Sequence, residues 1–181
     1  MKRRIIHIAD FFTDEVFGGA EIVDGIVRDF LAKKYTVQKI KSTDKEAIHK
    51  SLFDKEECVY LISNFVGLDD DSKYWLLNKK YFIFEHDHKY LSSRDPSLFE
   101  DFSAPEQFII NKFFYEGAQR VFCQSSIHER VIKKNLGIEN TINLGCSLWS
   151  DEELLVLEGN IDAKKNDKTC ILSSNNRVKG E

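Results

Sequence analysis

Apolar residues along this chain follow two spacings, which alternate over most of its length. Short apolar runs are typical of strands, whereas apolar pairs that recur every three or four residues are typical of amphipathic helices. The runs predict strands at residues 4–9, 35–40, 58–62, 81–84, 120–124, 141–144 and 169–172. The helical spacing and the capping pairs Thr43/Glu46, Ser126/Glu129 and Ser150/Glu153 predict helices at 20–34, from 43–46, after 69–71, around 108–117, at 126–136 and from 150 to 158.

Regular alternation of strands and helices is the pattern of an α/β domain. The run Cys58-Val-Tyr-Leu-Ile62 is apolar throughout, as expected of a central parallel strand that is covered on both faces. The sequence therefore predicts a Rossmann-like, doubly wound, mostly parallel sheet with helices on both faces. We expect this domain to cover residues 1–158, followed by a linker at 159–168 and by the start of a truncated second domain at 169–181.

The first helix shows which of its side chains should be buried. Its apolar pairs are Ile22/Val23, Ile26/Val27 and Phe30/Leu31, spaced four residues apart. We expect the polar residues between these pairs to face solvent. They are Glu21, Asp24, Arg28, Asp29, Lys33 and Lys34.

Composition narrows the class of protein. The 181 residues carry 26 basic and 30 acidic side chains, and 42% are apolar, which excludes a disordered chain and argues against a nucleic-acid binder. Cys58, Cys123, Cys146 and Cys170 have no metal-ligand spacing, so we expect free thiols in a cytoplasmic protein. No apolar stretch approaches the roughly 18 residues of a membrane span, and none near Met1 resembles a signal peptide.

Two loops after predicted strands hold candidate chemistry, because ligands of open α/β sheets bind beyond the carboxyl ends of the strands. The first contains Gly18-Gly19 ahead of a helix, where backbone N–H groups can face a phosphate. Its spacing fits neither a dinucleotide fingerprint nor a P-loop, and a simple tight turn is the alternative.

The second loop is Glu85-His86-Asp87-His88. Two imidazoles and two carboxylates at a strand end indicate either a functional site or a solvated polar loop in which Asp87 or Glu85 orients a histidine. As a polar residue at a strand end, His86 is expected to bury little. His86 and His88 are placed to bind a metal, but a third ligand at a recognisable spacing is missing.

Other polar residues are better explained by structure. We expect His7 to be a core or sheet-end histidine, and His49 and His128 to lie on helix surfaces. Helix capping accounts for the serine pair at 125–126 and for the three aspartates at 69–71, although the aspartates also suit a cation.

These segments together resemble the N-terminal half of GT-B glycosyltransferases, particularly the retaining family-4 type. The resemblance rests on the strand at 5–12, the helix opening at 17–21, the strand ending in His86-Asp87, the segment 117–125 and the pair Lys179-Gly180. In that family, two Rossmann-like domains enclose a nucleotide-sugar donor and an acceptor.

The resemblance implies specific roles. Gly18 and Gly19 would line the cleft near the diphosphate, and Lys179 would neutralise it. His86 would lie close to the reacting sugar, and Asp87 would orient its loop, which makes these two the catalytic candidates. Ser173 stands where the family has an arginine, and the family's paired-glutamate segment lies beyond residue 181.

We therefore expect a hexosyltransferase domain that lacks the donor-binding half. Its substrates would be a nucleotide-sugar and a sugar, lipid or protein acceptor, with no metal or other cofactor, and it would need a partner chain or a further domain. The alternative is a non-catalytic binding or assembly module that keeps the fold. A flavodoxin-like domain that binds a phosphorylated cofactor is a third interpretation.

Overall fold

The computed structural model describes residues 3–53 and 57–161 and contains a six-stranded sheet. Its strands are β1 (Arg4–Ala9), β2 (Thr36–Lys41), β3 (Cys58–Ile62), β4 (Tyr81–Phe84), β5 (Val121–Cys123) and β6 (Thr141–Asn143). The order is β2-β1-β3-β4-β5-β6, and each neighbouring pair is parallel. This is the Rossmann-like α/β architecture that the sequence predicts.

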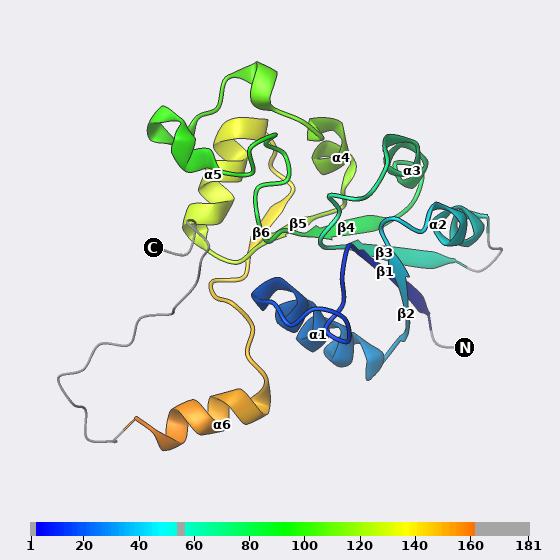
Figure 1. Ribbon diagram of the computed structural model, residues 1–181, viewed down its shortest axis with the longest axis vertical. Coiled ribbons are helices and arrows are strands. Elements are labelled where there is room, and N and C mark those ends of the chain that lie inside the picture. Colours follow the sequence, from blue (N-terminus) through cyan, green and yellow to red (C-terminus); the bar gives the residue numbers. More distant parts are fainter. Residues whose placement is uncertain (1–2, 54–56, 162–181) are drawn as a thin grey trace. The chain divides into compact units, whose positions relative to one another are not determined.

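Helices cover both faces of the sheet (Figure 1). Helix α1 (Gly19–Ala32) lies on one face, and four helices lie on the other. These four are α2 (Lys45–Leu52), α3 (Asp70–Leu76), α4 (Lys112–Gly117) and α5 (Ser126–Leu136). From β1 the chain passes through α1 to β2 at one edge of the sheet. From β2 it proceeds in the opposite direction, through β3, β4 and β5 to β6 at the other edge. Because right-handed crossovers are the rule, this reversal places α1 alone against its face.

Capping residues set the helix boundaries, with small shifts from the predicted ones. Asp69 accepts a hydrogen bond from the Ser72 N–H, as expected of a charged cap, and Gly137 ends α5 with a φ of 68°. Helix α2 is capped by Asp44 instead of Thr43, and α5 by Ser125 instead of Ser126, because those side chains accept from the free N–H group three residues ahead.

The core differs between the two faces. On the face of α2 to α5, alternate strand residues such as Ile6, Ile62 and Ile83 join a large cluster from which solvent is excluded. On the α1 face, Ile5, Leu61 and Phe84 form a smaller cluster with Val23 of α1. The strand alternation therefore decides which face each side chain occupies, and this continues into the residues that follow the strands.

The connection from β4 to α4 is unusually long. It contains three short 3-10 helices, η1 (Pro96–Leu98), η2 (Glu100–Phe102) and η3 (Glu106–Phe108), so the helix expected around 108–117 is regular only from Lys112. An antiparallel bridge between Leu91 and Ile109 brings the two ends of this β4–α4 connection together. Connections of this length without long regular elements are commonly functional.

The chain divides into two compact units after Leu148. In the second unit, the described residues include α6 (Asp151–Gly159), which Ser150 and Glu153 cap reciprocally, as their spacing predicts. The predicted strand at 169–172, the second-domain start at 169–181, and most of the linker at 159–168 lie outside the described residues.

Candidate functional site

The candidate residues gather where the strands end, and β4 distributes them to both faces of the sheet. Glu85 continues the row of Tyr81 and Ile83 and contacts Tyr115 of α4. His86 continues the row of Phe82 and Phe84 and contacts Asp24 of α1. Consecutive residues of one loop therefore belong to two separate polar clusters.

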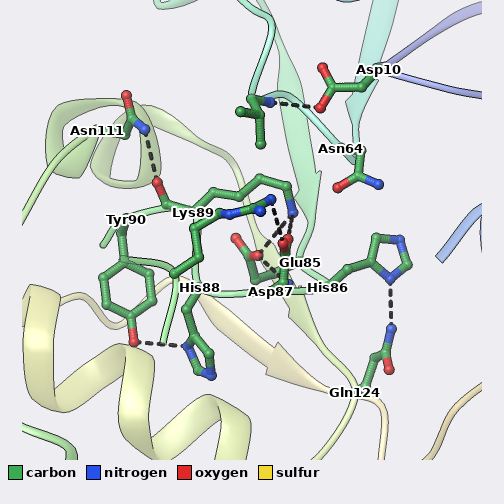
Figure 2. Close-up of polar contacts among 12 residues, drawn as sticks. Asp10, Asn64, Glu85, His86, Asp87, His88, Lys89, Tyr90, Asn111 and Gln124 are labelled. Atoms are coloured by element: carbon green, nitrogen blue, oxygen red, sulfur yellow. Dashed lines mark hydrogen bonds and ion pairs between the residues drawn. The ribbon is translucent and has the colours of Figure 1, made fainter. Parts of the chain in front are cut away.

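We call the first the α1-side cluster. His86 Nε2 lies 2.9 Å from Asp24 Oδ1. Its Nδ1 lies 2.8 Å from Gln124 Nε2 (Figure 2). On the other side of Asp24, His7 Nε2 lies 3.8 Å from Oδ2 and 2.8 Å from Ser63 Oγ. The cluster thus joins β1, α1 and the loops after β3, β4 and β5.

The α1-side cluster is shielded from water. Asp24 is 1% exposed, His7 and Ser63 are fully buried, and the His86 side chain is 5% exposed. Burial lowers the pKa of His7 to about 4, so His7 is neutral at pH 7. The expectation that His86 would bury little is wrong, because α1 and the loop after β5 enclose its ring.

The first turn of α1 holds the paired glycines. Gly18 is the N-cap residue, in an extended conformation, and Gly19 begins the helix. A side chain at Gly18 would collide with the Glu21 carboxylate, whereas Gly19 has open space around it. The carboxylate of Glu21 accepts a hydrogen bond from Asn64 at 3.2 Å, which ties the start of α1 to the loop after β3.

The expected outward direction of Glu21 and Asp24 is wrong. Both are buried, at 7% and 1% exposure, together with Val23. Because the polar ends of β1, β3 and β4 lie below this part of α1, the helix buries carboxylates there instead of apolar groups. Arg28, one turn further on, is half-buried and lies 3.4 Å from Thr13 Oγ1.

We call the second group the α4-side cluster. Glu85 is fully buried, accepts hydrogen bonds from the Tyr115 hydroxyl and the Asp87 N–H, and lies 3.4 Å from Lys89 Nζ. Burial alone would raise the pKa of Glu85, but the Lys89 ammonium and the Tyr115 hydrogen bond outweigh it and hold the pKa below its usual value. This is a paired, desolvated charge.

Asp87 ties the loop together. Its carboxylate contacts Lys89 Nζ and lies 3.0 Å from Arg94 Nη1, and its backbone N–H donates to Glu85. His88 has a φ of 34°, which few residues other than glycine adopt, and the surrounding contacts hold that strained turn in place. Asp87 is 41% exposed at its side chain and is the accessible carboxylate of this loop.

His88 and His128 form a third contact. Their rings lie 4.6 Å apart, edge to face, and His88 Nδ1 lies 2.9 Å from the Tyr90 hydroxyl. Burial, together with the neighbouring His128, lowers the pKa of His88 to about 4. The expected surface position holds for His49, which is exposed, but not for His128, which is half-buried because the 85–90 loop covers it.

The two histidines of the loop do not converge on one point. Figure 2 shows His86 directed toward Gln124 and His88 directed toward Tyr90. Within residues 3–53 and 57–161, no group of three histidine, cysteine, aspartate or glutamate side chains is arranged to hold a metal ion. Alternation along an extended strand would place residues 86 and 88 on the same side, so the divergence arises from the turn at His88, where φ is 34°.

Asp10 is a further polar residue at this edge of the sheet. Its carboxylate accepts hydrogen bonds from the backbone N–H groups of Val66 and Gly67, both at 2.9 Å, and contacts Ser42. Asp10 thereby fixes the loop between β3 and α3. The carboxylate at the end of β1 therefore has a structural role.

Sequence reasoning missed Asp24, Ser63 and Gln124. The sequence held a signal for two of them. His86 follows Phe84 by two residues and therefore lies on the same face of the sheet. Ser63 follows Leu61, and Gln124 follows Phe122, at the same distance. Lys179, the candidate for neutralising a diphosphate, lies outside the described residues.

No protein-family model matches this chain, and no curated protein matches it. Among the described residues, none of the helices is both long enough and apolar enough to cross a membrane.

Proposed function

We propose that this domain is the acceptor-side half of a cytoplasmic GT-B glycosyltransferase that transfers a hexose from a nucleotide-sugar. The observation that carries the proposal is the 2.9 Å hydrogen bond between His86 and Asp24. It joins the loop after β4 to the helix that Gly18-Gly19 opens, and these two segments carry the resemblance to that family. Their position beyond the carboxyl ends of parallel strands is where α/β domains bind ligands.

The proposed reaction exchanges two bonds at the anomeric carbon. The bond from this carbon to the diphosphate breaks as the carbon bonds to an acceptor hydroxyl oxygen, and the hydroxyl proton passes to the leaving nucleoside diphosphate. No further cofactor enters this scheme. The acceptor is a sugar, a lipid or a protein.

The roles follow the contacts of each residue. Both ring nitrogens of His86 are held by Asp24 and Gln124, so we assign it an orienting part beside the sugar. Asp87 orders the loop through Lys89 and Arg94. Gly18 and Gly19 offer close backbone approach to the diphosphate. Because Glu21 already places a negative charge there, the diphosphate requires a cation from elsewhere, for which Lys179 is the candidate.

The engaged nitrogens of His86 favour a second candidate function, a non-catalytic module that binds a ligand or partner chain with the same fold. This candidate predicts binding without turnover.

The test measures nucleoside diphosphate release by the intact protein with a panel of UDP- and GDP-sugars. We expect release with at least one donor, and a loss of roughly 10²-fold or more for His86→Ala, the scale of a positioned group at a reacting centre. His49→Ala, at an exposed histidine of α2, is the matched control and should retain its rate. Absence of release and transfer with every donor, in folded protein, would refute the enzyme and leave the binding module.

A further inference from the structure

The α1-side cluster determines which nitrogen of His86 carries a proton. The strong hydrogen-bonding partners of the Asp24 carboxylate are donors, because an ionised carboxylate can only accept. His86 Nε2 lies 2.9 Å from Asp24 Oδ1 and must therefore carry a hydrogen. His7, the other imidazole beside Asp24, lies 3.8 Å from Oδ2, which is too far for a hydrogen bond.

Gln124 determines the state of the other nitrogen. Its amide nitrogen lies 2.8 Å from His86 Nδ1, and its amide oxygen accepts from Ser147 Oγ at 3.3 Å. An amide nitrogen only donates, so Nδ1 must accept and carries no proton. These contacts suit an imidazole with its hydrogen on Nε2 and none on Nδ1.

We propose that Asp24 is a positioning residue of the candidate site, which fixes His86 as the Nε2–H tautomer, while Gln124 keeps that ring neutral. The hydrogen bonds hold the backbone of the loop after β4 against α1, so Asp24 acts on the site through His86 and touches no substrate itself. The consequence for turnover rests on the proposed function, but the tautomer does not.

Three titratable groups act on His86. Asp24 faces it from α1, His7 from β1 and His128 from α5. Burial lowers the pKa values of both His7 and His128 and so favours their neutral forms, which leaves Asp24 as the acidic neighbour of His86. Gln124→Glu places a second carboxylate against Nδ1 with almost no change in shape. A close opposite charge raises a histidine pKa by about 1–3 units.

The experiment is long-range ¹⁵N–¹H NMR of the histidine rings at pH 5–9. In the wild-type protein at pH 7 we expect a hydrogen on His86 Nε2 and none on Nδ1. In Gln124→Glu both nitrogens should be protonated at pH 7, with a titration midpoint at least about one unit higher. Gln119→Glu makes the same chemical change at an exposed position and should leave the midpoint unchanged.

Asp24→Asn removes the charge that selects the tautomer, so the Nε2–H preference should weaken. Its turnover in the intact protein should fall about tenfold or more through kcat, with KM for the donor little changed. If Asp24→Asn does not fold, the wild-type and Gln124→Glu spectra decide the matter. A proton on Nδ1 or a charged ring in the wild type, or an unshifted midpoint in Gln124→Glu, overturns the assignment. The expected tautomer without sugar transfer counts against the proposed enzyme only.

Discussion

Replacing Lys89 with methionine tests the α4-side cluster most directly. The Glu85 carboxylate is fully buried, and Lys89 is 2% exposed with Nζ 3.4 Å from Glu85 Oε1. Methionine keeps most of the apolar stem that lies near the Phe65 ring but removes the ammonium. The variant therefore leaves a buried carboxylate without its cation and changes the packing little.

The expected loss follows from the partners that Glu85 keeps. Removing one partner of a buried ion pair costs about 3–5 kcal/mol. Because Glu85 retains hydrogen bonds from the Tyr115 hydroxyl and the Asp87 N–H, we expect the lower end, about 3 kcal/mol. For a domain of this size, that loss lowers Tm by roughly 6–12 °C.

Urea unfolding at pH 7 measures this loss. The exposed Lys34→Met is the control and should change stability by less than about 0.5 kcal/mol. The double variant Glu85→Gln/Lys89→Met removes both charges and should regain most of the loss, because a neutral pair leaves no uncompensated charge. A loss below about 1 kcal/mol for Lys89→Met, or a double variant no more stable than the single one, would refute this account of Glu85.

Three further outcomes follow from the same contacts. The folded pKa of His7, about 4, lies below the unfolded value of 6.5, so the unfolded chain binds the proton first. The free energy of unfolding should therefore fall as pH drops from 6.5 to 4. In His7→Asn, urea midpoints measured over the same pH range should fall less steeply. Asp69→Ala removes the N-cap of α3 and should cost about 1 kcal/mol in the same assay, whereas exposed Asp29→Ala should not. Gly18→Ala should destabilise the protein by displacing Glu21, while Gly19→Ala should leave stability unchanged or raise it by up to about 1 kcal/mol; equal effects at both positions would contradict the geometry of this turn.

Most of the fold could be predicted from the sequence because the strands and helices differ in apolar spacing. The predicted strands within the described residues form, and they join one parallel sheet. Capping assignments were less accurate at Thr43 and Ser126, since neighbouring Asp44 and Ser125 offer the same chemistry and only backbone geometry selects between them.

The candidate site was harder to predict because helical periodicity assigns polar residues to solvent. The spacing of Asp24 assigns it to the solvent face of α1, but its side chain is buried. It is buried because it meets His7, Ser63 and His86, which lie on or just after three separate strands. Local spacing carries no information on such pairings between distant segments. The placement of α1 against the strand ends decides them.

The alternation at the end of β4 has a consequence for how this chain can change in length during evolution. A residue inserted or deleted between Tyr81 and Glu85 would move Glu85 and His86 each to the opposite face of the sheet, away from its own partners. Changes in length between Asp95 and Phe108 would instead fall beyond the bridge of Leu91 with Ile109 and beyond Arg94, the partner of Asp87. Natural variation in length should therefore be absent from β4 and concentrated in the β4–α4 connection. A new specificity can arise there without disturbing either polar cluster.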